Sequence, residues 1–381
     1  MIFRPAVRSL CAGAVVLAAG VTAIAPSAAL APLPGTRPLG GRTGQGAAAP
    51  ALPEQVSALS WVVADASTGD VLASKDAHRH LPPASTLKTL FALTVLPHLP
   101  SQQLHTVTSA DLDGLGEGSS QVGVTVGRAY RVDDLWRGVF LRSGGDAVHV
   151  LASMNGGWQK TTAEMRERAV QLGAKDTHVM SPDGYDTPGQ YSSAFDLAVF
   201  GRTGLADPAF ARYCSTSVAE FPGGRDKSGR AGAPYEIQNT NRLLSGTQDV
   251  SPYPGLIGVK NGYTTEAGNT LIAAAHRGGH TLIVTAMNPQ GAVYEDARAL
   301  LDWGFAAAGK VRPVGSLRPP VTTAAADSAA GPAHAPPGAP LVTDHHSVIR
   351  KSSPLVSVAV IGALFVSLSA SLWLLRRRMR R

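Results

Sequence analysis

The sequence predicts an α+β fold in which one antiparallel sheet collects strands from both ends of a single domain and helices flank it. Three observations support this prediction. Strand-like hairpins occur at about 60–74 and 269–287, helical periodicity occupies much of the chain between them, and a final helical segment spans 295–305. Because the two hairpins enclose the helical region, the sheet must join segments that are far apart in the sequence.

The first elements of the domain are a hairpin and a helix. Apolar and β-branched residues fill 60–65 and 71–74, and the turn-forming residues 67–70 separate them. This pattern is typical of two antiparallel strands joined by a short turn. From 85 to about 96 the apolar residues recur every three or four positions, which predicts a helix with one buried face.

Helices and then strands follow in the rest of the domain. Helical periodicity is found in 133–151 and 163–172. A short apolar strand at 255–259 precedes two longer ones at 269–276 and 281–287. A Gly-Gly pair between the last two strands suits a tight hairpin turn.

Composition and charge divide the chain into six segments. We predict a signal peptide at 1–31, a disordered linker at 32–55, a folded domain at 56–312, a Pro/Ala-rich linker at 313–353, a transmembrane helix at 354–376 and a basic cytoplasmic tail at 377–381. The leader ends in an Ala-x-Ala cleavage site, and an uncleaved N-terminal anchor is the alternative. The apolar run 355–375 has no charged residue, and a buried core helix is its alternative.

The formal net charge of +7 arises from the two ends of the chain. Arg4 and Arg8 lie in the leader and five arginines follow the apolar run, so the remainder is close to neutral. This distribution excludes the basic surface that nucleic-acid binding requires. Since positive charge gathers on the cytoplasmic side, we expect a single-pass protein of the cell membrane whose domain is extracellular.

The candidate catalytic centre begins with a Ser-x-x-Lys sequence formed by Ser85 and Lys88. A serine hydroxyl is a weak nucleophile near neutral pH and needs a base within hydrogen-bonding distance. On a helix the two positions share a face, so the Lys88 amine can accept the Ser85 proton if burial or a second cation lowers its pKa. The alternative is a helix N-cap serine followed by a solvated lysine.

Two further segments carry groups suited to the same chemistry. Ser143, which precedes two glycines, offers a hydroxyl that can pass a proton between Lys88 and a leaving group. Lys260 follows the strand 255–259, so we place it near a strand end, where it can bind a substrate carboxylate and act as the second cation. Gly262 lets a substrate backbone approach closely. Taken alone, Ser143 also fits a helix N-cap, and Lys260 also fits a turn.

In this order and with their flanking residues, the three segments resemble the motifs of the D-alanyl-D-alanine carboxypeptidases, the low-molecular-weight penicillin-binding proteins of serine peptidase family S11. Further matching stretches are 116–120, 181–185, 191–197, 262–270 and 294–296. The resemblance covers nearly all of the predicted domain. It implies the penicillin-binding-protein and serine β-lactamase-like transpeptidase fold, an antiparallel sheet flanked by helices with an additional helical lobe.

The resemblance also implies a role for each site residue. Ser85 would be acylated by the penultimate D-alanine of a peptidoglycan stem peptide with Lys88 as the base, and Ser143 would relay protons. Lys260 would help to bind the terminal carboxylate, and the backbone N–H groups of Ser85 and Tyr263 would form the oxyanion hole. Peptidoglycan stem peptides are the implied substrates, β-lactam antibiotics the implied acylating inhibitors, and no metal or other cofactor is implied.

Two positions depart from the family pattern. The second motif normally ends in an asparagine that steadies the lysine and bonds the substrate amide, and Gly145 stands at that substrate-binding position here. Asn261 stands where a threonine is usual in the third motif and keeps a polar side chain. The glycine predicts slow turnover or altered positioning of the substrate.

The sequence is therefore compatible with three functions. The first is an active membrane-anchored D,D-carboxypeptidase that removes the terminal D-alanine of stem peptides. The second is a catalytically weakened homologue that binds muropeptide or β-lactam with little turnover because of Gly145. For that case the sequence predicts a large gain in rate when asparagine is restored at position 145. The third is a β-lactamase, for which the sequence assigns no glutamate to activate the deacylating water.

Overall fold

The computed structural model describes residues 42–43, 49–224 and 229–318. The expected signal peptide at 1–31, transmembrane helix at 354–376 and tail at 377–381 lie outside the described residues, as does most of each expected linker. Among the residues that the structure describes, no helix has the length and apolar character needed to cross a membrane.

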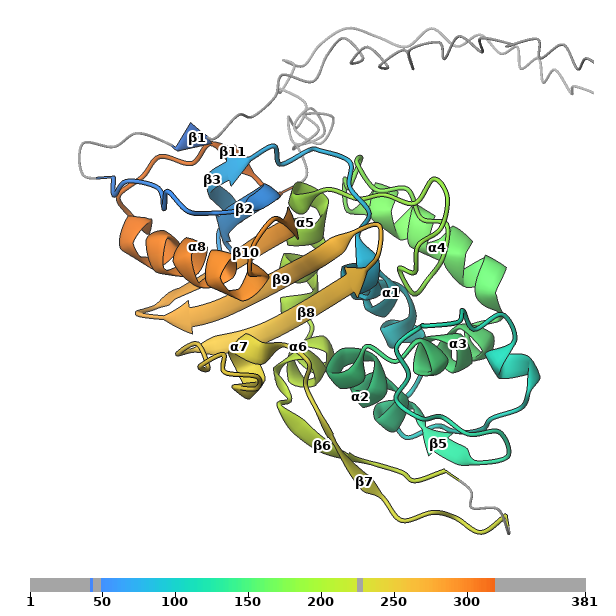
Figure 1. Cartoon of the computed structure of the whole chain (residues 1–381). Helices are drawn as coiled ribbons and strands as arrows, with labels where there is room; N and C mark the ends of the chain where they lie inside the picture. The colour runs from blue at the N-terminus through green and yellow to red at the C-terminus, as the bar shows by residue number, and fades with distance from the viewer. Residues whose placement is uncertain (1–41, 44–48, 225–228, 319–381) are drawn as a thin grey trace, which may run out of the picture. The chain divides into compact units, whose positions relative to one another are not determined.

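A seven-stranded antiparallel sheet forms the centre of the described structure (Figure 1). Its strand order is β1-β3-β2-β10-β9-β8, and β11 pairs with β3. The strands are β1 (Arg42–Thr43), β2 (Ala58–Asp65), β3 (Asp70–Lys75), β8 (Leu256–Thr264), β9 (Gly268–Arg277), β10 (His280–Pro289) and β11 (Gly315–Ser316). Strands from both ends of the domain therefore lie side by side, as the sequence predicts.

In the sequence, most of the helices come between β3 and β8, and α8 follows β10. They are α1 (Lys88–Val95), α2 (Val132–Arg142), α3 (Gly145–Met154), α4 (Trp158–Gln171), α5 (Ala194–Leu205), α6 (Pro208–Ser215), α7 (Arg242–Ser245) and α8 (Val293–Ala307). Short 3₁₀ helices are η1 (Ala84–Leu87), η2 (Leu96–His98) and η3 (Ala110–Leu112). Two small antiparallel pairs complete the structure, β4 (Leu104–Thr106) with β5 (Ala129–Arg131) and β6 (Val218–Phe221) with β7 (Tyr235–Gln238).

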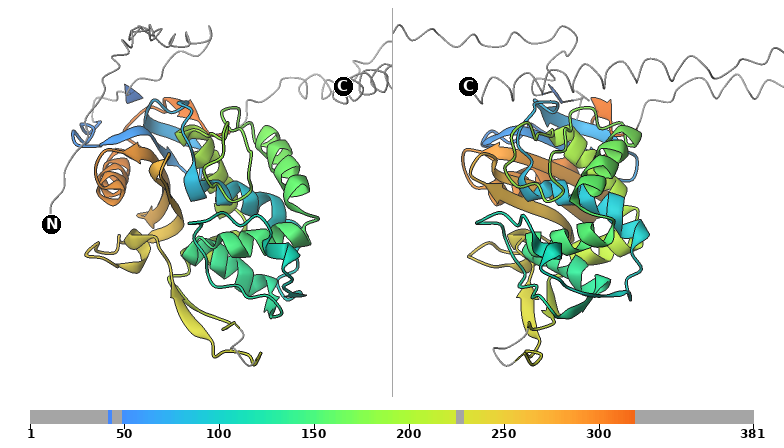
Figure 2. Two further views of the ribbon diagram at one scale, coloured as in Figure 1. Left: turned by 45° about the vertical axis from the view of Figure 1, so that its right-hand side comes forward. Right: turned by 90° about the vertical axis from the view of Figure 1, so that its right-hand side faces the viewer.

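The sheet is covered on both faces. In the left view of Figure 2, α8 (orange) lies on one side of the sheet and the long green helices lie on the other. Side chains of β9 and β10 alternate between two hydrophobic cores. Leu271 and Leu282 join the core on the α8 side, whereas Ile272 and Ile283 join the larger core that includes α1 and α5. Because both faces are buried, these strands are almost continuously apolar.

A helical lobe formed by α2, α3 and α4 stands beside the sheet (Figure 1). Helix α1 connects the two parts, because it packs against both α4 and α5. The aromatic rings of Phe91 in α1 and of Trp136 and Phe140 in α2 pack together in this region. The helix that carries the candidate base therefore lies in the core between sheet and lobe.

Both predicted hairpins are confirmed, with turn chemistry that explains them. Strands β9 and β10 are joined by Gly278 and Gly279, whose φ angles of 57° and 80° suit the tight turn between them. At the β2–β3 turn the Asp65 carboxylate accepts hydrogen bonds from the backbone N–H groups of Ser67 and Thr68. Such a side chain replaces the backbone partner that a turn lacks.

Two expectations about the elements are wrong. The helix expected at 133–151 is two helices, α2 and α3, because Ser143 adopts a left-handed φ of 57° between them. The strand expected to end before Lys260 continues as β8 to Thr264, so this lysine lies inside a strand rather than near its end. Cross-strand pairing of Lys260 with Ile272 of β9 extends the strand through the motif.

The folded unit also extends beyond the limits expected at 56 and 312. Before the first limit, the Trp303 indole N–H donates a hydrogen bond to the Pro50 carbonyl oxygen at 3.1 Å. After the second limit, the Val314 N–H donates to the Val71 carbonyl oxygen at 2.8 Å, and Leu317 is buried. The described ends of both expected linkers therefore pack on the domain.

Candidate active site

Ser85 and Lys88 are brought together where η1 passes into α1. The amine nitrogen of Lys88 (Nζ) and the hydroxyl oxygen of Ser85 (Oγ) are 2.8 Å apart. In a 3₁₀ turn residues i and i+3 lie almost directly above one another, which explains the contact. The expectation that these two side chains share a helical face is confirmed.

The backbone before the serine is unusual. Ala84 is buried and adopts a φ of 49°, in the left-handed region that residues other than glycine seldom occupy. Its carbonyl oxygen lies so close to Gly184 that a Cβ there would be 2.0 Å away. Strained conformations of this kind persist where the surrounding structure fixes them, commonly at functional sites.

Lys88 is almost completely buried, with 4% of its surface exposed. Besides its contact with Ser85, its amine donates a hydrogen bond to the Asp183 carbonyl oxygen at 2.6 Å. Burial lowers the pKa of Lys88 to about 8, although the charges of Asp183 and Asp146 act in the opposite direction. Near neutral pH an appreciable fraction of this amine is therefore neutral and able to accept a proton.

Lys260 projects from β8 into the protein interior and is 1% exposed. Its amine donates a hydrogen bond to the Asn261 carbonyl oxygen at 2.7 Å. Burial first, and then the charge of Lys88, lowers the pKa of Lys260 well below its ordinary value. The charge of Lys88 therefore acts on Lys260, whereas burial rather than Lys260 lowers the pKa of Lys88.

Strand β8 passes directly beside the serine. A Cβ built on Gly262 would lie 2.6 Å from the Ser85 backbone nitrogen and 2.7 Å from Thr270 Oγ1. Only glycine allows this approach of the strand to the start of the helix. The first N–H groups of a helix have no intrahelical acceptor, so the Ser85 N–H is available to an anion here.

A cavity of about 220 Å³ opens above the serine. It is lined by Ser85, Lys88, Gly118, Ser119, Ser120, Asp183, Tyr185, Asp186, Tyr263, Thr264 and Thr265. Of the residues predicted from the sequence, Ser85, Lys88 and Tyr263 line this cavity. Ser143, Gly145, Lys260 and Gly262 are not part of the lining within the described structure, and Gly262 lines a neighbouring cavity instead.

The second motif forms the break between α2 and α3. Ser143 is 7% exposed, and its hydroxyl has no hydrogen-bond partner among the described residues. Gly145 begins α3, and its N–H donates to the Ser120 carbonyl oxygen at 2.6 Å. The motif therefore contacts the 116–124 segment, which supplies Ser119 and Ser120 to the cavity.

Asp146 holds that segment in place. Its buried carboxylate accepts hydrogen bonds from the backbone N–H groups of Val122, Gly123 and Val124, at 2.8–2.9 Å. The carboxylate also lies at the first turn of α3, where the helix dipole favours negative charge. The sequence contains this aspartate directly after the motif, but it does not reveal a partner 22–24 positions away.

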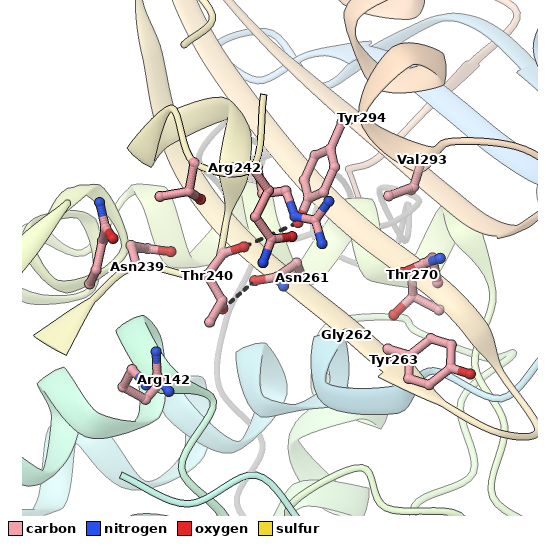
Figure 3. Close-up of a pocket in the computed structure, with 14 residues that line it drawn as sticks. Arg142, Asn239, Thr240, Arg242, Asn261, Gly262, Tyr263, Thr270, Val293 and Tyr294 are labelled. Carbon is pink, nitrogen blue, oxygen red and sulfur yellow. Dashed lines mark hydrogen bonds between the residues drawn. The ribbon is translucent and has the colours of Figure 1, made fainter. Parts of the chain in front are cut away.

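A second and larger cavity, of about 500 Å³, lies along β8 and shares Tyr263 with the first (Figure 3). Arg142 at the end of α2 and Arg242 at the start of α7 both line it, together with Asn261. Among the described residues neither arginine forms an ion pair. The Arg242 guanidinium instead lies over the Tyr294 ring, 5.5 Å from its centroid.

Sequence reasoning missed four groups that border the site. They are the Ser119 hydroxyl, the Asp183 carbonyl, and the guanidinium groups of Arg142 and Arg242. Asp183 and Ser119 fall inside the stretches 181–185 and 116–120 that support the family resemblance, which was the signal available for them. The two arginines lie in segments 100 positions apart and have no common pattern in the sequence.

Comparison with protein families identifies known relatives of this chain. Residues 45–291 match the S11 peptidase family, described as D-alanyl-D-alanine carboxypeptidase. The D-alanyl-D-alanine carboxypeptidase DacB2 of Mycobacterium tuberculosis is 40% identical over 256 residues, which are 65% of this chain and 82% of that protein. DacD of Escherichia coli is 34% identical over 268 residues, which are 66% of this chain and 64% of that protein.

Solved structures agree with these matches. The D-alanyl-D-alanine carboxypeptidase of M. tuberculosis superposes with a TM-score of 0.63 and 37% identity, covering 71% of this chain and 99% of that one. The DD-transpeptidase of Streptomyces K15 superposes with a TM-score of 0.62 and 29% identity, covering 68% and 100%. The penicillin-binding-protein-like α+β fold expected from the sequence is confirmed.

Proposed function

The chain belongs to the S11 family of D-alanyl-D-alanine carboxypeptidases, and we propose that it removes the terminal D-alanine from peptidoglycan stem peptides through an acyl-enzyme on Ser85. The observation that carries this proposal is the distance of 2.8 Å between the Lys88 amine and the Ser85 hydroxyl, at the wall of a cavity. A nucleophile and its base within hydrogen-bonding distance are the minimum that acyl transfer requires.

The reaction follows from the position of these two side chains. Ser85 Oγ forms a bond with the carbonyl carbon of the penultimate D-alanine while its proton moves to the neutral Lys88 amine. The C–N bond to the terminal D-alanine then breaks, and the proton passes to the leaving amine. Water gives a proton to Lys88 and attacks the ester, and the proton returns to the departing Ser85 oxygen.

The oxyanion formed in each half-reaction would be held by the N–H groups of Ser85 and Tyr263. The close approach of Gly262 to the Ser85 nitrogen supports this assignment, because it places β8 beside the start of the helix. Donors arranged before the reaction stabilise the developing charge, and losing one typically lowers the rate about 100- to 1000-fold.

Ser143 would relay the proton from Lys88 to the leaving amine. Its hydroxyl is buried and without a partner among the described residues, so it is not committed to a structural hydrogen bond. A buried hydroxyl of this kind needs an explanation, and transient bonding during turnover provides one.

The terminal carboxylate of the substrate would lie at the junction of the two cavities. Lys260 is buried in β8 and its amine donates to the Asn261 carbonyl, so it would act on the carboxylate through charge alone, and the negative charge of the bound carboxylate would favour the protonated amine against the effect of burial. Arg142 and Arg242 line the larger cavity and can reach the carboxylate directly with planar donors. This division assigns the buried cation to electrostatics and the arginines to contact.

We do not favour the weakened homologue that the sequence raised as an alternative. The nucleophile, the base and the buried second lysine lie close together despite Gly145. The curated relatives with which the chain aligns carry the name of D-alanyl-D-alanine carboxypeptidases. These observations support an enzyme rather than a binding protein.

We further propose that the enzyme acts outside the cell, anchored by a C-terminal helix at 354–376 after removal of the leader 1–31. The uncharged apolar run 355–375 and the arginines after it support this arrangement. β-Lactams, whose strained amide resembles the scissile bond, would acylate the same serine.

The test is D-alanine release from a synthetic pentapeptide ending in D-Ala-D-Ala, by the full chain purified in mild detergent and by its Ser85→Ala variant. Acylation by a fluorescent penicillin is measured in parallel. We expect release and labelling with the native chain and neither with the variant. Labelling without release would refute the carboxypeptidase, and release that survives in the variant would refute the role of Ser85.

A further inference from the structure

Strand β8 runs past two cavities that differ in charge. Residues 261–263 line the larger cavity, whose charged side chains are the two arginines described above. Residues 263–265 line the cavity of the nucleophile, whose charged side chains besides the base are the carboxylates of Asp183 and Asp186. Passing along the strand from residue 261 to residue 265 therefore leads from positive to negative charge.

This order determines which part of a stem peptide meets each charge. The terminal carboxylate is assigned to the arginines, and the scissile carbonyl must lie at Ser85 Oγ. An extended peptide advances about 3.3 Å per residue, so its earlier residues continue along β8 toward 264–265. The residue that precedes the two D-alanines then lies within reach of the carboxylates of the second cavity.

Asp183 already has structural partners. It is buried, and its Oδ1 accepts hydrogen bonds from the Ser181 hydroxyl and the Tyr185 N–H. Its charge is also one of those that raise the pKa of Lys88. This carboxylate therefore serves its own loop and the base.

Asp186 has unused acceptor positions on a fixed backbone. Its Oδ2 accepts a hydrogen bond from the Glu266 N–H at 3.2 Å, whereas its Oδ1 is buried without a partner among the described residues. Within the same part of the chain it forms no ion pair, although a carboxylate can accept about four hydrogen bonds. The Tyr185 carbonyl oxygen before it accepts hydrogen bonds from Gln190 Nε2 and Thr187 Oγ1, at 2.8 and 3.0 Å, which hold the loop.

We propose that Asp186 binds a side-chain ammonium group on the residue that precedes the two D-alanines of the stem peptide. A diamino acid at that position presents such a group, and a carboxylate with unused acceptors is its complementary partner. The charges of the bound peptide then match those of the two cavities, with its carboxylate at the arginines and its ammonium at Asp186.

The inference rests on the proposed carboxypeptidase function and adds a substrate preference to it. Stem peptides whose side-chain amine is free are bound more tightly than those in which it is acylated, for example by a cross-link to a second peptide. The contact lies away from the reacting atoms, so it acts equally on the bound substrate and on the transition state. Such an interaction lowers KM rather than raising kcat.

The experiment uses the full chain in mild detergent and two synthetic tripeptides that end in D-Ala-D-Ala. Their first residue is an L-lysine acetylated on its α-amine, and its ε-amine is free in one peptide and acetylated in the other. D-Alanine release at pH 7 gives KM and kcat for the native chain and for Asp186→Asn, whose amide oxygen can still accept the Glu266 N–H.

We expect the native chain to have an about 10-fold lower KM for the free amine, the effect of one charge-assisted hydrogen bond. In Asp186→Asn the two peptides should have the same KM. Adding about 0.5 M sodium chloride should reduce the preference of the native chain, because salt screens a charge pair in a cavity open to solvent.

Glu266→Gln is the matched control. It removes one negative charge from the neighbouring turn, but Glu266 is exposed and does not line the cavity. The preference should therefore change less than in Asp186→Asn. Equal KM values for the two peptides with the native chain, a preference that survives in Asp186→Asn, or an equal loss in Glu266→Gln would each overturn the inference. A preference carried by kcat instead of KM would do so as well.

A second readout separates this inference from the carboxypeptidase itself. Each tripeptide competes with a fluorescent penicillin for Ser85, which requires binding of the peptide but no release of D-alanine. The free-amine peptide should protect the native chain at an about 10-fold lower concentration than the acetylated one, and Asp186→Asn should remove this difference. If the native chain released no D-alanine, the carboxypeptidase would be refuted, and the competition would still decide the role of Asp186.

Discussion

The buried state of Lys88 predicts how the acylation of Ser85 depends on pH. With a pKa lowered to about 8 from the ordinary 10.5, the neutral, proton-accepting fraction is about one tenth at pH 7, about one half at pH 8 and about nine tenths at pH 9. The acylation rate should therefore rise about 10-fold between pH 7 and pH 9 and level off above. A lysine with an ordinary pKa would give about a 100-fold rise over the same interval without a plateau.

The rate constant for acylation by a fluorescent penicillin, at a series of pH values, measures this profile. Asp183→Asn provides a matched perturbation of the midpoint. The Asp183 Oδ1 accepts hydrogen bonds from the Ser181 hydroxyl and the Tyr185 N–H, and an asparagine oxygen can accept both. Because the aspartate charge raises the pKa of Lys88, its removal should move the midpoint below pH 8.

Two results would refute the reasoning. A rate that keeps rising tenfold per pH unit through pH 9 would mean that burial does not lower the pKa of Lys88. A midpoint that moves upward in Asp183→Asn would mean that the charge of residue 183 does not act on the amine. Circular dichroism at each pH separates either result from unfolding.

Further substitutions test the neighbouring groups. Lys88→Met should abolish acylation but raise the free energy of unfolding at pH 7 by about 1–2 kcal/mol. The pKa shift of the buried amine corresponds to about 3 kcal/mol of destabilisation that the substitution removes, and the unpaired Asp183 carbonyl offsets about 1 kcal/mol of this gain. Urea denaturation should show this advantage shrinking as the pH rises from 8 toward 10.5, since the unfolded lysine then loses its proton as well. Gly262→Ala, with its Cβ 2.6 Å from the Ser85 nitrogen, should lower the acylation rate about 100-fold or more; a native rate would contradict the close approach. Arg242→Gln should raise KM about 10-fold for the free-acid peptide but not for its C-terminal amide, and equal effects on both would rule out a carboxylate contact.

Much of this architecture could be predicted because the signals are local. The two hairpins follow from runs of apolar residues around short turns, and the Ser85–Lys88 contact follows from the spacing within one helical turn. The order of the three motifs then indicates that distant segments meet. None of these inferences requires knowledge of how the segments pack.

The errors lie where packing decides the local conformation. Helical periodicity continues through Ser143, but its left-handed backbone ends α2 and lets Gly145 start a new helix against the 116–124 segment. Likewise, the polar residues after 255–259 suggest a strand end, whereas pairing with β9 carries β8 through Lys260. Tertiary hydrogen bonds outweigh the local pattern at both places.

The Gly145 position shows why a motif cannot be judged from its own residues. Read in sequence, the missing side chain implies a weaker enzyme. In the structure the same space holds a hydroxyl from a segment 26 positions earlier in the chain. The sequence carries no pattern that places Ser119 beside Gly145, because the position of the 116–124 segment depends on its hydrogen bonds with Asp146 and Gly145.

The two lysines of the site lower the stability of the fold that carries them. Lys88 and Lys260 are both buried, and each is destabilising in its charged form at neutral pH. Lys88 enters from the core helix α1, whereas Lys260 projects from β8, which is held by continuous pairing with β9. The two faces of packed apolar side chains offset the free energy lost at the amines. Substitutions that remove a lysine should therefore stabilise the fold and abolish the chemistry together, because a single property, burial of the amine, determines both.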